Sequence, residues 1–282
     1  ALETYSCITY FEDCVSKGTF SNQSAGFMLS QVHAVAHFTR CKAEGVFSNS
    51  DGFCRLSGAS YKDCHVKGSF KTKGDPFQDG GWGFVQMRPK GLVLLTYPNF
   101  EDCTFEGTMH QLAVKTTGAF ASEAGSIVRC LARMNIVIGR EAEKTPWYTE
   151  IRFNGLADRA RLIEESAFIG TLMSDQPLVS CYGLSANVTE GVTNCFVRAN
   201  LTSLDKAVGL VGNLEGDLAN SYFVGTLIAP ETKMVDVYPA SFDFEKPVTA
   251  HFIGEASDLW ATKKTEEEMN AEGLPYWDFD ST

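Results

Sequence analysis

FEDCVSKGTF (residues 11–20) and FTRCKAEGVF (residues 38–47) are two copies of a ten-residue signature that occurs eight times along the chain. Each copy has an apolar residue three positions before a central Cys or Ser and a second apolar residue six positions after it. A small residue stands four positions after the centre in every copy except that of Met134. Recurrence at intervals of 23 to 39 residues predicts a repeat protein in which each copy is one structural unit. The central positions, which we call the marker column, are Cys14, Cys41, Cys64, Cys103, Cys130, Ser166, Cys195 and Ser221.

The composition of each unit predicts strands rather than helices. The signature is rich in β-branched and aromatic residues, and glycines such as Gly18 and Gly45 would weaken a helix in its middle. Most units also carry a second element that opens with glycine, for example Gly52-Phe53-Cys54. We therefore expect an all-β parallel β-helix solenoid of about eight to nine coils, with the strands of successive coils about 4.8 Å apart.

The repeats predict two parts of the chain. Residues 1–255 form the β-helix repeat domain, with residues 250–254 as a degenerate ninth unit, and residues 256–282 form a C-terminal cap or linker segment. In this segment Thr265 and Glu268 make a capping box and Gly273 is a helix stop, which predicts a short helical cap over residues 265–272. We expect it to shield the last coil, together with nearby apolar residues. These are Trp260, Leu274, Tyr276, Trp277 and Phe279.

VGLVGNLEGDLANSY (residues 208–222) resembles the GLUG motif, a repeat of bacterial surface and secreted proteins that is named for its Gly-Leu-Val-Gly-like core. The other units match this motif more loosely, and the resemblance covers roughly residues 5–255. It implies a parallel β-helix and display on a surface, and it carries no catalytic residues. The C-terminal segment is similar to the tail that often follows GLUG arrays and leads on to a further strand or domain.

Charge and composition exclude several classes of partner. The net charge of −11 disfavours nucleic acid, whose binding depends on cationic contacts to phosphate, and it also disfavours an anionic membrane. No apolar run is long enough to predict a transmembrane helix. We expect an extracellular, cell-surface or virion location, with a homotrimer or further domains as additional partners. The N-terminal edge near Cys7 lacks an obvious cap of its own and is expected to contact another subunit or domain.

Nine cysteines would ordinarily indicate a disulfide scaffold, but six of them lie in the marker column and alternate there with serine. Side chains of one column point the same way into the core, where thiols behave as small, weakly polar hydrophobic groups. We expect these cysteines to be buried and free. Cys7, Cys54 and Cys181 lie outside the column and are the ones for which pairing stays open.

Two columns of charged residues flank the marker column. Opposite charges at the strand spacing attract, so we expect structural ion ladders on the outer face and an Asn ladder at a bend near Asn194 and Asn220. One position before the marker stand Asp13, Arg40, Asp63, Asp102, Arg129, Glu165, Asn194 and Asn220. Three positions after it stand Lys17, Glu44, Lys67, Glu106, Arg133, Ile169, Arg198 and Val224.

Stacking thus accounts for the carboxylates that could otherwise serve a glycosidase or a polysaccharide lyase. His33 and His37 lie four residues apart, which on a strand separates them by roughly 13 Å and predicts no shared metal ion. Cys64 and His65 are neighbours on opposite faces of a strand, so they predict no nucleophile–base pair. We therefore expect no catalytic residues, no cofactor and no metal site.

Binding residues are expected where the repeat spacing breaks, because solenoids usually bind through insertions. The first long interval, around residues 71–92, holds Trp82, Phe84 and Arg88, with glycines beside an indole that we expect near the surface. The second, around residues 137–160, holds Trp147 and Tyr148. Exposed aromatics suit sugar rings or a protein hot spot, and the five residues are our candidate ligand-binding patch. The alternative is that both indoles pack down as lids over a neighbouring coil.

Three functions are compatible with these features. The first is a non-enzymatic adhesion module that recognises a glycan or protein through its loop insertions. The second is a β-helix polysaccharide lyase or glycoside hydrolase, which requires converging acids outside the stacking columns. The third is a tail-fibre or virion component of a phage.

Overall fold

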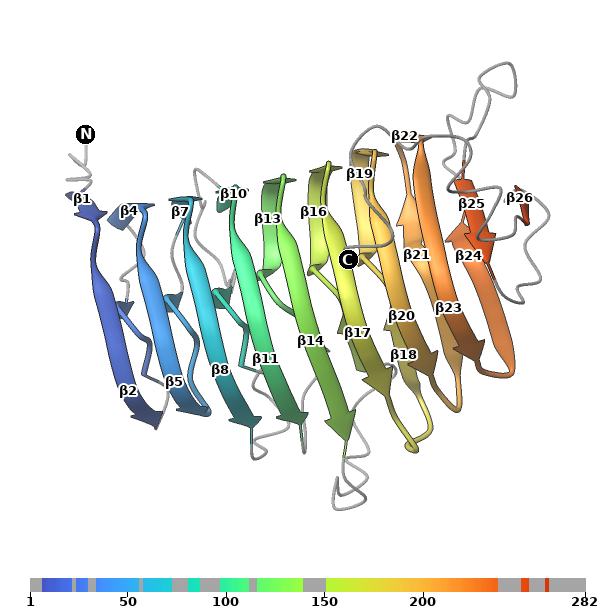
Figure 1. The fold of residues 1–282 in the computed structure, drawn as a ribbon, viewed down its shortest axis with the longest axis horizontal. Helices are drawn as coiled ribbons and strands as arrows, with labels where there is room; N and C mark the ends of the chain where they lie inside the picture. Colours follow the sequence, from blue (N-terminus) through green and yellow to red (C-terminus); the bar gives the residue numbers. More distant parts are fainter. Residues whose placement is uncertain are drawn as a thin grey trace, which may run out of the picture.

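A computed structural model shows parallel strands stacked in two sheets, with the coils arranged side by side along the long axis (Figure 1). The structure describes residues 7–21, 24–29, 34–55, 58–72, 81–86, 97–111, 116–138, 151–237, 250–253 and 262–263. All the secondary structure of this part is strand, and the expected all-β parallel solenoid is confirmed, with about seven turns.

Sheet B is built from the strands that follow the marker column. Its register aligns the signature positions of every coil, so that Gly18, Gly45, Gly68 and Gly107 form one row. Residue 250 pairs with Ser221, which places the degenerate ninth unit in the same sheet. The strands in order are β2 (Val15–Ser21), β5 (Lys42–Ser48), β8 (His65–Thr72), β11 (Thr104–Gln111), β14 (Leu131–Ile138), β17 (Ala167–Met173), β20 (Phe196–Thr202), β23 (Ser221–Ile228), β25 (Ala250–Ile253) and β26 (Thr262–Lys263).

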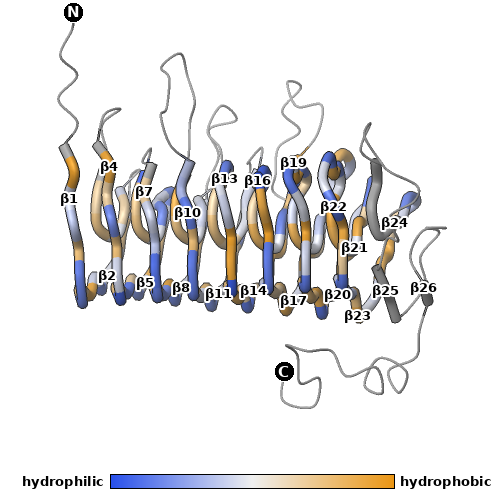
Figure 2. Tube along the Cα trace, turned by 90° about the horizontal axis from the view of Figure 1, so that it is seen from above, coloured by the Kyte–Doolittle hydropathy of each residue, from blue (hydrophilic) through white to orange (hydrophobic). Residues whose placement is uncertain are grey.

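Sheet A combines two strands from each coil. The strands that precede the marker are β1 (Cys7–Glu12), β4 (Ala34–Thr39), β7 (Gly58–Lys62), β10 (Asn99–Glu101), β13 (Ala121–Val128), β16 (Ala157–Glu164), β19 (Ser185–Thr193) and β22 (Asp217–Ala219). The other strands of this sheet are β3 (Met28–Leu29), β6 (Cys54–Arg55), β9 (Val85–Gln86), β12 (Thr116–Thr117), β15 (Ile151–Asn154), β18 (Val179–Tyr182), β21 (Lys206–Leu214) and β24 (Glu231–Val237). Each coil is therefore one turn of the backbone that leads into the next coil, as Figure 2 shows from above.

The core consists of side-chain rows that run along the solenoid axis. Phe11, Phe38, Tyr61 and Phe100 stack with ring centroids 4.7, 5.2 and 4.9 Å apart. A second stack continues through Phe27, Phe53, Phe84 and Phe120 at 4.8, 5.0 and 5.1 Å. These separations match the strand spacing, so each aromatic ring packs on its counterpart in the next coil.

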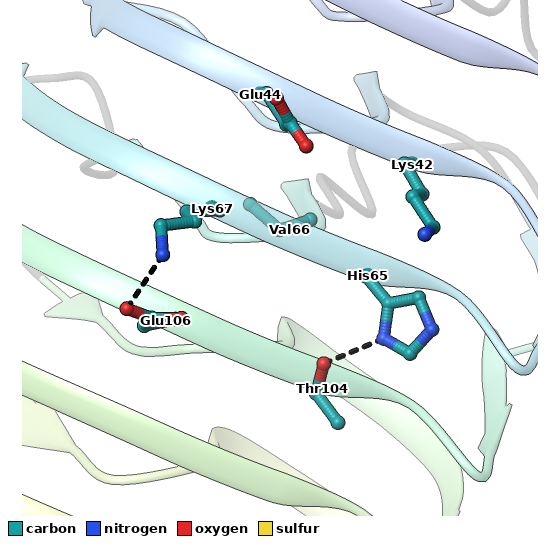
Figure 3. Close-up of a pocket in the computed structure, with 7 residues that line it drawn as sticks. All are labelled: Lys42, Glu44, His65, Val66, Lys67, Thr104 and Glu106. Carbon is teal, nitrogen blue, oxygen red and sulfur yellow. Dashed lines mark hydrogen bonds and ion pairs between the residues drawn. The ribbon is translucent and has the colours of Figure 1, made fainter.

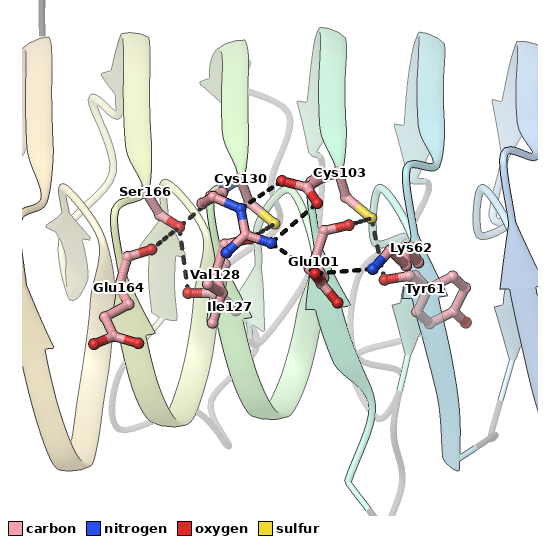
Figure 4. Close-up of polar contacts among 11 residues, drawn as sticks. Tyr61, Lys62, Glu101, Cys103, Ile127, Val128, Cys130, Glu164 and Ser166 are labelled. Carbon is pink, nitrogen blue, oxygen red and sulfur yellow. Dashed lines mark hydrogen bonds and ion pairs between the residues drawn. The ribbon is translucent and has the colours of Figure 1, made fainter. Parts of the chain in front are cut away.

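The marker column closes the corner between sheets A and B. The residue before each marker has a left-handed backbone, with φ between 46° and 55° in all eight coils. The marker side chain then donates to the carbonyl two residues earlier: Cys103 Sγ to Glu101 O at 3.2 Å, and Ser166 Oγ to Glu164 O at 2.7 Å (Figure 4). Cys and Ser alternate at this position because each is small and carries one donor.

All six cysteines of the marker column are free, as expected, and so are Cys54 and Cys181 outside it, while the side chain of Cys7 is not among those that the structure describes. All of the described thiols are buried except that of Cys14, which is partly exposed. Their burial in the corner and core explains why the cysteine count does not indicate a disulfide scaffold. The expected helix over residues 265–272 lies outside the described residues, and β26 shows that sheet B continues past residue 255.

Candidate functional site

The outer ladders confirm the expected pairing of charges between coils. Arg40 binds Asp13 and Arg129 binds Asp102, both with the Nε–Oδ1 distance at 2.7 Å. At the last two corners of the same column, Asn220 Nδ2 donates to Asn194 Oδ1 at 3.2 Å. On sheet B, Lys17 binds Glu44 at 2.9 Å, and Lys67 binds Glu106 at 2.9 Å. These contacts are solvent-exposed, so each stabilises the fold only modestly.

The surface exposure that we expected for the aromatic patch is wrong for the two members that the structure describes. Trp82 and Phe84 are both 0% exposed, and Phe84 belongs to the central aromatic stack. The glycine after the indole serves close packing, since a Cβ at Gly83 would lie 2.0 Å from Ala119 O of the next coil. The indole ring likewise packs against Gly118, where a Cβ would lie 2.8 Å from the Trp82 ring. The indole of Trp82 therefore packs down over a neighbouring coil, which is the alternative that the sequence left open.

The other three candidate residues, Arg88, Trp147 and Tyr148, lie outside the described residues, as does His33. His37 lies on β4, where it stacks on Tyr10 at 5.0 Å and its Nδ1 shares a 2.6 Å hydrogen bond with the Ser60 hydroxyl. Among the described residues, no three His, Cys, Asp or Glu side chains come together as a metal site. The same part of the chain contains no helix that is long and apolar enough to span a membrane.

A polar recess opens on the outer face of sheet B, across β5, β8 and β11 (Figure 3). Its cavity volume is about 280 Å³. The residues that line it come from the first three positions after the marker in three successive coils. They are Lys42, Glu44, His65, Val66, Lys67, Thr104 and Glu106.

Side chains of the recess are held by contacts between neighbouring coils. His65 Nδ1 shares a 2.7 Å hydrogen bond with Thr104 Oγ1, and its Nε2 lies 3.5 Å from Asp63 Oδ1. Lys67 reaches across to Glu106, as Figure 3 shows. Because parallel strands repeat at about 4.8 Å, the recess presents alternating donors and acceptors at that interval.

Electrostatics in the recess keep Glu44 charged. A hydrogen bond from Lys17, with the positive charge of that side chain, lowers the pKa of Glu44. The hydrogen bond to Glu106 raises the pKa of Lys67. A general acid of a glycosidase needs the opposite shift, a carboxyl whose pKa is raised toward neutrality. The formal charges of Lys42 and Lys67 balance those of Glu44 and Glu106, so the recess as a whole is near neutral.

Another acid that stacking does not explain has a structural partner. Asp158 is buried and accepts two hydrogen bonds from Arg152, at 2.6 and 2.9 Å. Asn154 next to it donates to Thr117 O and accepts from the backbone N–H of Ala186, which ties three coils together. A buried ion pair of this kind with its hydrogen bonds satisfied fixes local geometry.

The recess was not identified from the sequence, although three of its residues, Glu44, Lys67 and Glu106, lie in a recognised column. Ladder stacking alone explains the third position after the marker, and the first position belongs to neither charged column. A signal was present, because that column is polar at Lys42, His65 and Thr104 and apolar from Leu131 onward.

Comparison of the chain with protein-family models, with curated proteins and with solved structures found no match in any of the three. A β-helix hosts many functions, so the fold alone does not select one. The functional argument therefore depends on the chemistry of the recess.

Proposed function

We propose that the protein is a non-enzymatic recognition module that binds a hydroxyl-rich glycan through the polar recess of sheet B. The observation that carries the proposal is the row of charged and hydroxyl side chains that neighbouring coils already orient at the strand interval. Pre-oriented side chains lose little conformational entropy when they bind a ligand.

The charge balance of the recess supports a neutral ligand. Lys42 and Lys67 alternate with Glu44 and Glu106, so a polyanion would meet repulsion at each carboxylate. Sugar hydroxyls both donate and accept, and they match such an alternating row. Binding sites of this type fix orientation through a few well-placed polar groups.

The competing function is cleavage of a polysaccharide by the same recess. It is disfavoured because the pKa of Glu44 is lowered, which leaves this carboxyl ionised and unable to donate a proton near neutral pH. Its neighbour Lys67 has a raised pKa and stays protonated, so it is a poor general base for a lyase. Display on a cell or particle surface is part of the proposal, and the resemblance of residues 208–222 to the GLUG motif supports it.

A glycan array tests the proposal with two matched double variants. Lys42→Ser/His65→Ser removes two recess side chains, and Lys62→Ser/His37→Ser removes the same residue types from sheet A. We expect the recess variant to lose at least ten-fold in affinity for any glycan that the wild type binds, and the sheet A variant to bind normally. Both variants should keep the wild-type unfolding midpoint within a few degrees.

Parallel assays on the bound glycans measure new reducing ends and unsaturated products, which report hydrolysis and elimination respectively. The proposal expects neither product above background. If the wild type releases either product and the recess variant does not, the recess cleaves the glycan and the proposal is wrong. Full glycan binding by the recess variant would move the site elsewhere on the molecule.

A further inference from the structure

Five successive corners of the solenoid hold cysteine, and the corners that follow alternate with serine. From the N-terminal end the marker column runs Cys14, Cys41, Cys64, Cys103, Cys130, Ser166, Cys195 and Ser221. Serine makes the same corner contact as cysteine, since Ser166 Oγ donates to the carbonyl two residues earlier at 2.7 Å. The corner itself thus requires only a small side chain with one donor. A row of adjacent thiols is a separate property of the N-terminal coils.

Cys64, Cys103 and Cys130 occupy one line along the solenoid axis. The residues on both sides of these corners pair in register between coils, and Thr104 N donates to Cys64 O at 2.9 Å. Neighbouring markers are therefore one strand spacing apart, about 4.8 Å. All three thiols are free and at most 1% exposed. Figure 4 shows the sulfur atoms of Cys103 and Cys130 at neighbouring corners.

These three thiols interact with one another. The Cys103 thiol shares hydrogen bonds with the thiols of Cys64 and Cys130. The hydrogen bond with Cys103, with burial, raises the pKa of Cys64, so this thiol stays protonated while no ion is bound. Cys195 has no such neighbour in the column, because the register of β17, β20 and β23 places Ser166 and Ser221 on either side of it.

A soft, univalent metal ion fits the gap between two such thiols. Two metal–thiolate bonds of about 2.3 Å placed end to end span about 4.6 Å, which matches the interval between coils. Thiolate ligands select soft ions such as Cu(I). Structural zinc needs four ligands around one point, whereas no three His, Cys, Asp or Glu side chains meet in this way within the described part of the chain. A straight row of thiols offers each ion two ligands, one on either side.

We propose that the marker column binds two Cu(I) ions in two-coordinate sites, one between Cys64 and Cys103 and one between Cys103 and Cys130. On binding, three S–H bonds break and three protons leave to solvent, while four S–Cu bonds form and the copper stays univalent. Cys103 is the shared ligand, and the two sites join the coils of β8, β11 and β14 at their corners. Cys14 at the N-terminal end of the row is partly exposed, so an ion can enter the row from solvent there.

Anaerobic titration of the reduced full-length chain with Cu(I), in competition with a chromogenic Cu(I) chelator, tests the sites. We expect the wild type to retain two ions per chain against the chelator. Cys103→Ser removes the shared ligand and should lose both ions, whereas Cys64→Ser should lose one. Cys195→Ser is the matched control, because it makes the same change in the same column at a thiol without thiol neighbours, and it should retain both. The unfolding midpoints of the metal-free variants, within a few degrees of the wild type, verify the fold.

X-ray absorption at the copper edge of the loaded wild type gives a second readout that needs no variant. Each copper should have two sulfur ligands at about 2.3 Å. Three or more ligands, or nitrogen in place of sulfur, would overturn the proposal. Equal copper retention by the wild type and a folded Cys103→Ser would overturn it as well, and so would complete loss of copper from the wild type to the chelator.

Discussion

Each corner of the solenoid places a residue in the left-handed region, which costs an ordinary side chain roughly 1–2 kcal/mol. Asn and Asp tolerate this region better, and five of the eight positions before the marker hold Asp or Asn. Arg40 and Arg129 also adopt the left-handed conformation, and they form ion pairs with Asp13 and Asp102 respectively. The remaining case, Glu165 with φ 46°, stands beside Asn194 in the column.

Glu165→Asn should therefore stabilise the fold by about 0.5–1.5 kcal/mol, because Asn relieves backbone strain and extends the ladder of Asn194 and Asn220. Urea denaturation measures the change. Glu165→Ala is the control: it removes the same charge but keeps the strain, and it should not stabilise. Equal effects of the two substitutions would show that charge rather than conformation matters here.

The close approach of neighbouring coils at Gly170 predicts that a substitution there destabilises the fold. Gly170 has φ 153°, and a Cβ there would lie 1.8 Å from Met134 O. Gly170→Ala should cost about 2 kcal/mol or more in the free energy of unfolding, because the backbone of one coil must move. Gly18→Ala is the matched control in the same row, since its Cβ would meet only Phe20 at 4.0 Å and should change stability by less than about 0.5 kcal/mol. Similar losses at both positions would refute this account of the row.

At the scale of elements, the marker column places thiols at six of the eight corners, and burial shifts the pKa of several of them. Burial raises the pKa of Cys41 to about 11 and that of Cys195 to about 12, above the ordinary value of 9.0. Between the ordinary thiol pKa of 9.0 and the raised pKa of about 12, the folded state therefore binds more protons than the unfolded state. Stability is fully present below pH 9 and falls as pH rises toward 12.

The pH dependence is measured by urea denaturation between pH 8 and pH 12. Cys195→Ser should flatten the alkaline loss of stability, because serine does not titrate there and serine already occupies the column at Ser166 and Ser221. The expected cost of the substitution at pH 8 is small, within about 1 kcal/mol. An unchanged alkaline slope in Cys195→Ser would mean that the Cys195 thiol does not contribute to the effect.

Prediction from sequence succeeded where the repeat itself decides the structure. The spacing of Cys14 through Ser221 gives the register of sheet B, and the alternating charges give the ion pairs, because both follow from stacking at one interval. The left-handed corners were missed, since Arg40, Arg129 and Glu165 are not residues that favour them. Trp82 was misplaced because glycine indicates either mobility or close packing, and only contacts such as that of Gly83 with Ala119 distinguish the two.

The whole molecule presents two different long faces. Charged and amide pairs cover the corners on one side, while sheet B passes from a polar recess at β5, β8 and β11 to an apolar strip at β17, β20 and β23. The recess could not be identified from single residues, because it forms only when three coils bring Lys42, His65 and Thr104 side by side. The net charge of −11 favours solubility and leaves this near-neutral recess as an exception on an acidic surface.

Glycan binding by the recess is the central claim, and the affinity of Lys42→Ser/His65→Ser for an array-selected glycan tests it most directly. Titration calorimetry on the folded variant, beside the wild type and Lys62→Ser/His37→Ser, gives that affinity. The account predicts a dissociation constant at least ten-fold larger for the recess variant, and an unchanged one for Lys62→Ser/His37→Ser. Equal affinity of all three proteins, each with its fold intact, would contradict it.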